Sequence, residues 1–293
     1  MASLKEIRNR IVSVQSTQKI TGAMKLVSAA KLRRAQTAII GLRPYSNKLN
    51  DILSNLSASV ENSENSPLFA QRDHKKVLLI VITSNRGLCG SFNSSIIKEV
   101  SKIVESKYKS QFETGNLDLI CIGKKGKEQL EKKFNIVDFH ETILDKAVFD
   151  QIAVIADQLM QDYSDEKYDK VEVLYNKFIN PATQRIKLEN YLPIENIQTT
   201  ESAQNNVVEY IFEPSQAELL DVLIPKILKI QLYKTLLDSI ASEHGARMTS
   251  MSKASDNANE LLRDLKLKYN NARQAAITNE LNEIVGGAEA LKG

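Results

Sequence analysis

Two seams of apolar residues with heptad spacing, one at each end of the chain, constrain the fold more than any other feature. The first seam runs from Leu4 to Leu42, and the second from Ile227 to Ala276. Helices that carry them would reach about 80 Å and about 110 Å at 1.5 Å per residue, longer than a compact domain of this size can bury. We therefore expect the two helices to pair with each other as an antiparallel coiled coil.

The periodicity changes between about Lys75 and Pro193. Short apolar runs rich in β-branched residues there alternate with helical stretches, which predicts an α/β fold with a mostly parallel sheet. The expected strands are 77–83, 117–123 and 171–179, with 184–194 and 207–212 as further candidates, and the expected helices are 93–110, 124–133 and 148–163. The chain thus predicts a Rossmann-like α/β domain inserted between the two long helices.

This pattern gives four expected segments. They are an N-terminal coiled-coil helix (1–60), a Ser/Asn-rich linker (61–74), the α/β domain (75–206) and a C-terminal strand with the second coiled-coil helix (207–293). Gly41 and Pro44 predict a kink in the first helix. Pro225 is consistent either with a kink or with the first position of the second helix.

The first seam turns polar in its middle, at Gln18, Thr21, Lys25 and Ser28. The apolar residues there lie one position earlier, at Ile20, Met24 and Val27. The apolar stripe therefore rotates around the helix. We expect this part of the helix to contact a second surface besides its coiled-coil partner.

Positive charge is concentrated at the start of the chain. The first fifty residues hold ten Lys and Arg against a single acid, Glu6, which gives them about +9 and leaves about −6 for the rest of a chain of net charge +3. A solvated helix face does not explain a single sign of charge. DNA binding is disfavoured because the charges are spread along some forty residues rather than packed in one block. Binding to acidic lipid is disfavoured because Tyr45 is the only aromatic residue of this segment.

No enzymatic signature stands out. The sequence "SNRGLCGSFN" (84–93) follows an expected strand, but it lacks the glycine spacing of phosphate-binding loops, so a structural turn is favoured. "GKKGK" (123–127) is interpreted as a solvated basic turn. His74, His140 and His244 are too scattered for a metal site, and Cys89 and Cys121 indicate neither a disulfide nor zinc. We expect no catalytic, metal-binding or cofactor-binding residues.

The C-terminal end keeps helical spacing through two glycines. Gly286 and Gly287 would each cost about 1 kcal/mol relative to alanine, yet apolar residues recur from Ile277 to Leu291. A frayed terminus is one interpretation. The sharper one is a narrow apolar tip that fits, or turns, within a collar.

Four blocks of the sequence resemble the γ subunit family of F-type ATP synthases, of the bacterial type. They are Ser3 to Gln36, Thr83 to Asn93, Ser242 to Ala258, and Tyr269 to Leu291 with its specific pattern ITxExxExxxGA. Asn85 stands where the family usually has Asp, and Ser91 where it usually has Gly.

The resemblance implies a non-catalytic central rotor of F1Fo ATP synthase, which couples proton flow through the membrane c-ring to ATP synthesis or hydrolysis. The implied partners are three α and three β subunits per copy of this chain, the ε subunit and the c-ring, with no nucleic acid and no membrane insertion. The implied location is the cytoplasmic face of the bacterial inner membrane. The resemblance further implies coupling contacts to the α and β subunits from Met24, Lys25, Arg247, Met248, Arg273, Gln274, Thr278, Glu280 and Glu283.

We accordingly expect Arg247→Ala to weaken coupling between hydrolysis and proton transport without removing nucleotide binding. The alternative from a different class is a coiled-coil adaptor whose α/β domain binds a nucleotide or metabolite by itself.

Overall fold

The computed structural model describes residues 4–59, 67–145, 147–194 and 216–290. The chain divides into two compact units. One comprises the stretch up to Ser28 together with the stretch from Met248 onward, and the other runs from Ala29 to Arg247.

Two long helices contribute to both units. They are α1 (Leu4–Ser59) and α6 (Gln216–Ala290). In the first unit three side-chain hydrogen bonds join them, Gln18 to Asn259, Thr21 to Ser255 and Lys25 to Ser252. The two residue numbers of each pair add to 276 or 277, so the helices run antiparallel, which confirms the expected coiled coil. The seam of α6 is buried there at Met251, Ala258, Leu262 and Leu265.

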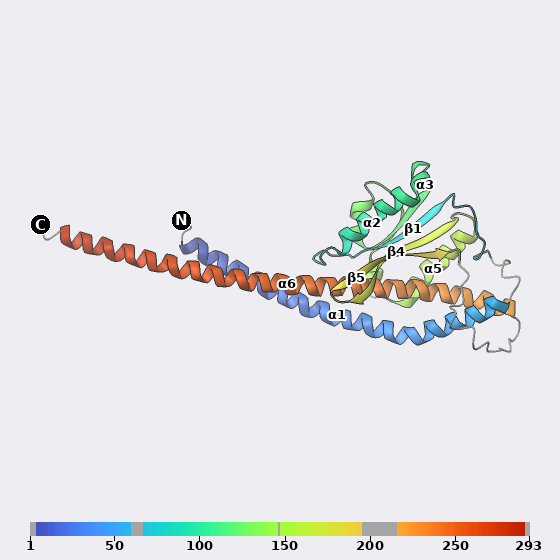
Figure 1. Cartoon of the computed structure of the whole chain (residues 1–293), viewed down its shortest axis with the longest axis horizontal. Helices are drawn as coiled ribbons and strands as arrows, with labels where there is room; N and C mark the ends of the chain where they lie inside the picture. The colour runs from blue at the N-terminus through green and yellow to red at the C-terminus, as the bar shows by residue number, and fades with distance from the viewer. Residues whose placement is uncertain (1–3, 60–66, 146, 195–215, 291–293) are drawn as a thin grey trace. The chain divides into compact units, whose positions relative to one another are not determined.

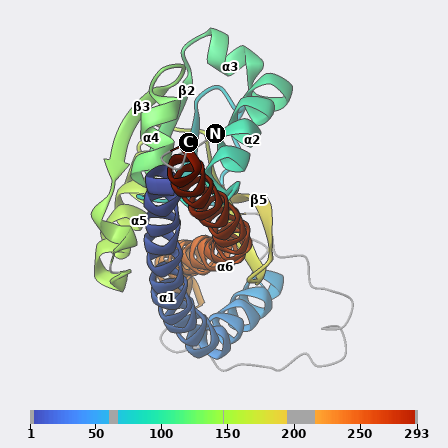
Figure 2. The same cartoon turned by 90° about the vertical axis from the view of Figure 1, so that its left-hand side faces the viewer.

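The two prolines for which a kink was considered, Pro44 and Pro225, lie inside the long helices. α1 continues through Pro44, and Figure 2 shows it bending in its second half, the half that contains this proline. A proline removes one backbone hydrogen bond and crowds the preceding turn, which bends a helix without ending it. The interpretation of Pro225 as a first helical position is wrong, since α6 begins at Gln216.

The second unit contains a five-stranded sheet in the order β3-β2-β1-β4-β5. Its strands are β1 (Val77–Ile82), β2 (Leu117–Ile122), β3 (Asn135–His140), β4 (Lys170–Asn180) and β5 (Thr183–Leu192). β1, β2, β3 and β4 pair in parallel, and β5 pairs antiparallel with β4. This arrangement confirms the Rossmann-like domain between the two helices.

Shorter helices cover the sheet. They are α2 (Phe92–Lys107), α3 (Lys109–Glu113), α4 (Lys124–Leu130), the 3-10 turn η2 (Thr142–Leu144) and α5 (Phe149–Ser164). Figure 1 shows α2 and α5 on opposite faces of the sheet, and every residue of β1 is buried. A continuous apolar run such as "VLLIVI" is what a parallel strand covered on both faces requires.

Two expectations about this unit need correction. The expected strands did not include β3, whose residues are all exposed or half-buried and so lack the apolar run of the inner strands. "GKKGK" is more than a solvated turn, because Gly123 (φ 108) and Gly126 let the start of α4 approach Thr83. A Cβ atom on Gly123 would lie 2.4 Å from the Thr83 carbonyl oxygen. The expected strand 207–212 lies outside the described residues.

Candidate functional site

The crevice where a Rossmann-like sheet usually binds a ligand lies at the carboxyl ends of its strands, at the point where the strand order reverses, here between β1 and its neighbour β4. Here α6 occupies that place. The Ser242 hydroxyl donates a hydrogen bond to the Asn176 carbonyl oxygen (2.9 Å), and the Asn176 side chain donates to the carbonyl of Phe92 (3.3 Å). Asn176 lies just past the end of β1, since Val81 pairs with Leu174. The loop of residues 84–91 after β1 therefore faces a helix of its own chain.

Arg247 is the centre of this contact. Its Nη2 donates to the Arg86 carbonyl (2.9 Å), and its Nε donates to the Gly87 carbonyl (3.3 Å). Its Nη1 pairs with Glu243 Oε1 at 2.6 Å and lies 3.2 Å from His244 Nδ1. Only 7% of Arg247 is exposed. Arg247 therefore uses its hydrogen-bond donors within the chain. The family resemblance implied instead that it contacts a partner subunit.

The polarity of the loop is opposite to that of a phosphate-binding loop. Phosphate-binding loops point backbone N–H groups at the anion. In this chain the loop presents the carbonyl oxygens of Arg86 and Gly87 to a guanidinium. This geometry favours the structural turn over the phosphate site.

Burial sets the protonation of the two acceptors beside Arg247. Burial raises the pKa of Glu243, while the Arg247 guanidinium acts in the opposite direction. Burial lowers the pKa of His244 to about 4, and the positive charge of Arg247 adds to that effect. His244 is therefore neutral at neutral pH. Because arginine can only donate, His244 Nδ1 must be the acceptor and its proton lies on Nε2.

The same loop exposes its tip. Cys89 and Phe92 are buried against Ala246 of α6. Leu88, between these anchors and Gly87, is 63% exposed and has a φ of 62°. A left-handed backbone is unusual for leucine and marks a conformation imposed by its surroundings.

The paired part of the first unit contains three of the expected coupling residues. Met24 and Met248 are half-buried, and Lys25 is exposed, with its Nζ donating to Ser252 Oγ at 3.0 Å. The seam itself follows the polar residues, with Thr21 and Ser28 buried. The rotated apolar stripe of Ile20, Met24 and Val27 is largely exposed to solvent.

The apolar residues of that stripe lie mostly in solvent. Ile20 is 57% exposed and Val27 58%, and the neighbouring Leu26 is also exposed. This agrees with a second surface beyond the coiled-coil partner. All ten cations of the first fifty residues are exposed as well.

The far end of α6 carries the remaining expected residues, and all of them are exposed. They are Arg273, Gln274, Thr278, Glu280 and Glu283. Since paired residue numbers add to about 277, Leu4 at the start of α1 lies level with about residue 273. The rest of α6 extends past the first described residue of α1, and it exposes Ile277, Leu281, Ile284 and Val285.

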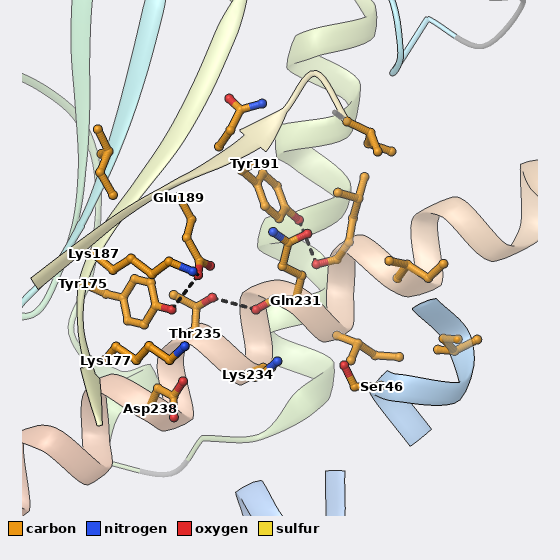
Figure 3. A pocket seen from close by; sticks show the side chains of 17 residues that line it. Ser46, Tyr175, Lys177, Lys187, Glu189, Tyr191, Gln231, Lys234, Thr235 and Asp238 are labelled. Carbon is orange, nitrogen blue, oxygen red and sulfur yellow. Dashed lines mark hydrogen bonds and ion pairs between the residues drawn. The ribbon is translucent and has the colours of Figure 1, made fainter. Parts of the chain in front are cut away.

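A cavity of about 580 Å³ lies between β4, β5 and the helices (Figure 3). Charged side chains of both signs line it, and they bind one another. Glu189 accepts hydrogen bonds from Lys187 and from the Tyr175 hydroxyl, and the Tyr191 hydroxyl donates to the Leu228 carbonyl. Burial raises the pKa of Asp238, and Lys234 and Lys177 oppose that shift. This mixture favours no ligand class.

The described part of the chain has neither a membrane-spanning helix nor a grouped set of metal ligands. Within it, no helix has an apolar stretch long enough to cross a membrane. No group of three or more His, Cys, Asp or Glu in the same residues is arranged to hold a metal ion.

Sequence reasoning missed the inward role of Arg247, although a signal was present. Glu243 and Arg247 stand four residues apart on a predicted helix, which is the spacing of an intrahelical ion pair. That spacing could have indicated that the arginine is held by its own helix.

Comparison with known proteins gives a consistent result. The family model described as ATP synthase matches residues 3–291. The chain is 54% identical to the ATP synthase gamma chain of Flavobacterium johnsoniae and 47% identical to that of a Geobacter species, each over the full length of both chains.

Chains of solved mitochondrial ATP synthase structures have a similar fold. A chain of the Euglena gracilis mitochondrial ATP synthase OSCP/F1/c-ring structure has a TM-score of 0.66 at 18% identity, covering 98% of this chain and 94% of that one. A chain of the Tetrahymena thermophila central stalk/c-ring structure has a TM-score of 0.61 at 24% identity, covering 80% and 99%. At these identities the similarity shows the fold.

Proposed function

Since the chain belongs to the family of ATP synthase gamma chains, we propose that it is the central rotor subunit of an F1Fo ATP synthase. It couples proton flow through a membrane c-ring to ATP synthesis or hydrolysis on an αβ hexamer. The chain itself has no catalytic site in this proposal. It acts at the cytoplasmic face of the bacterial inner membrane as a peripheral subunit.

One observation carries the proposal, the long end of α6 that continues past the start of α1. Apolar residues on that end, among them Leu281 and Ile284, are exposed. A single helix in water with an apolar stripe and two glycines is marginal. A surrounding collar of partner subunits would bury that stripe, as a ring of three α and three β subunits does in this proposal.

The charge of α1 fits the same partner. Its exposed cations have one sign over some forty residues. Acidic groups of successive subunits would attract such a helix at any rotation angle, since exposed charges act over roughly a Debye length of 8–10 Å. The rotated stripe at Ile20 and Val27 makes the surface unequal around the axis, so the rotor angle can favour one catalytic subunit over the other two.

The proposed coupling contacts fall into two groups. Met24, Lys25 and Met248 lie on the paired helices, and Arg273, Gln274, Thr278, Glu280 and Glu283 lie on the far end of α6. The exposure of Lys25 and of the second group supports direct contact with α and β subunits. Arg247 is the exception, and its role is taken up below. The ε subunit and the c-ring complete the proposed partners.

Purification under gentle solubilisation tests the proposal. Affinity-tagged chain from membranes should bring down α and β subunits at three copies each, in a complex that hydrolyses ATP. The competing adaptor function predicts instead that the chain is recovered without them. It also predicts that the isolated chain binds ATP, ADP or a dinucleotide in calorimetry, which a rotor does not require.

A further inference from the structure

Arg247, on α6, forms a buried set of hydrogen bonds within the α/β unit. It donates to two loop carbonyls, those of Arg86 and Gly87, and pairs with Glu243 and His244 on its own helix. An arginine that reached out to a partner subunit would keep donors exposed. With 7% exposure, Arg247 has little surface to offer.

The two loop carbonyls lie directly before the exposed tip residue Leu88. On the other side of Leu88, the buried Cys89 packs against α6. The tip, defined as Arg86, Gly87 and Leu88, is thus held from both sides. This explains how Leu88 keeps a φ of 62°, in the left-handed region that residues other than glycine rarely adopt.

We propose that Arg247 is a positioning residue, which fixes the loop of residues 84–93 to α6 and so holds the Arg86–Leu88 tip where a partner subunit can contact it. The identity of that partner, an α or β subunit, rests on the proposed function. The side chains that make the contact are Arg86 and Leu88, which are exposed. Arg247 acts through them.

The chemistry around the guanidinium predicts what its removal does. Without Arg247, two carbonyls lose their donor and the buried Glu243 carboxylate loses its counter-charge. Unpaired buried polar groups are costly, so the loop separates from α6 to admit water. Cys121 lies in β2, belongs to the buried core of the sheet and takes part in none of these bonds. The loop should therefore loosen while the sheet stays intact.

The first experiment uses the two cysteines of the full-length isolated chain as reporters. Cys89 is 2% exposed in the loop, and Cys121 is fully buried in the sheet. In Arg247→Gln, labelling of Cys89 by a small thiol reagent under native conditions should rise at least tenfold, while Cys121 stays protected. Arg247→Lys, which can reach one of the acceptors, should give an intermediate rate.

Two outcomes would overturn the proposal. Unchanged Cys89 labelling in Arg247→Gln would show that the loop does not depend on the guanidinium. An equal rise for Cys89 and Cys121 would show that Arg247 supports the whole α/β unit rather than the loop. The matched control is Arg86→Ala, which removes the exposed side chain but keeps the bonded carbonyl. It should leave Cys89 protected.

The second experiment measures coupling in the assembled complex as protons pumped per ATP hydrolysed. Arg86→Ala and Arg247→Gln should each lower this ratio, about twofold or more, and the double variant should be no worse than the stronger single variant. Sites that act through one contact are non-additive in this way. Fold-changes that multiply in the double variant, or no effect of Arg86→Ala, would instead make Arg247 an independent partner contact.

The two experiments separate this inference from the proposed function. If the chain fails to assemble with α and β subunits, the rotor function fails, whereas the Cys89 result still stands on the isolated chain. If assembly succeeds but Cys89 stays protected in Arg247→Gln, only the positioning role is lost.

Discussion

Single residues decide how closely the pieces of the α/β unit approach one another. Gly123 shows this most directly, because its backbone (φ 108, ψ 136) is accessible in practice only to glycine and its neighbour is a backbone carbonyl. If Thr83 or the start of α4 moved away, the hydrogen bonds from the Thr83 N–H to the Ile122 carbonyl and from the Gly126 N–H to Thr83 Oγ1 would be disturbed. Gly123 therefore has a packing role, which the interpretation of "GKKGK" as a solvated basic turn did not include.

Gly123→Ala should lower the free energy of unfolding by about 3 kcal/mol or more, through backbone strain and overlap with Thr83. Urea unfolding of the full chain measures it. Gly115→Ala is the matched control, since Gly115 also has a positive φ of 72° but nothing within 4 Å of the added Cβ. It should cost only about 1 kcal/mol. Equal losses in the two variants would mean that overlap with Thr83 contributes nothing.

His244 should make stability depend on pH. Its pKa is lowered to about 4 in the folded chain, from an ordinary value of 6.5. Between those values the unfolded chain binds the proton and the folded chain does not, so stability falls as the pH is lowered from 6.5 toward 4. The slope from this group is at most about 1.4 kcal/mol per pH unit.

The measurement compares wild type with His244→Asn, which keeps an acceptor for Arg247 but cannot titrate. Glu243 titrates in both proteins, and its raised pKa acts with the opposite sign, so the difference between the two curves isolates the histidine. Wild type should lose stability relative to the variant below pH 6.5. Parallel curves would contradict a depressed histidine pKa.

At the scale of elements, the polar stretch of the helix pair is stabilised by bonds across the seam. Thr21, which is buried, and Ser255 share a hydrogen bond of 2.7 Å, flanked by Gln18 with Asn259 and Lys25 with Ser252. Polar pairs at seam positions lower stability but specify register. They also direct the apolar residues Ile20 and Val27 outward.

Thr21→Val should destabilise the helix pair by about 1 kcal/mol, because the Ser255 hydroxyl loses its partner. Ser255→Ala introduced into that variant should restore most of the loss, since both ends of the bond are then apolar. Thermal unfolding followed by far-ultraviolet circular dichroism measures both. The single variant Ser255→Ala completes the comparison. If the double variant loses as much stability as the two single variants added together, the hydrogen bond contributes nothing to the pairing.

At the scale of the whole molecule, the end of α6 after Ala276 differs from the rest of the chain, because its described side chains are not buried within the chain. The described residues after Ala276 are exposed wherever their side chains are described, so they contribute little to folding. Their exposed apolar residues are available for the contact with partner subunits that we propose.

A chain that ends at Ala276 should keep its free energy of unfolding within about 0.5 kcal/mol, as for surface changes in general. The isolated full-length chain should self-associate, and the shortened chain should not, as measured by sedimentation velocity. A full-length control with Ile277, Leu281 and Ile284 changed to Gln should also lose self-association. If that control still associates, the apolar stripe is not the cause.

Much of the architecture was predictable from the sequence because it rests on local periodicity. The heptad seams predict the antiparallel helix pair, and continuous apolar runs predict β1, β2 and β4, since buried elements need apolar residues at fixed spacing. β3 was missed because an edge strand with little burial carries no such run. The coupling contacts expected of Lys25, Thr278 and Glu283 came from the family resemblance, and all three side chains are exposed.

The role of Arg247 was decided by the tertiary structure alone. In sequence it is a cation on a long helix, equally suited to an external acidic partner or to internal acceptors. Its partners Arg86 and Gly87 lie some 160 positions away in the chain, and only the meeting of the β1 loop with α6 brings their carbonyls to the guanidinium. Periodicity determines which face of an element is buried, whereas long-range packing determines what a buried charge binds.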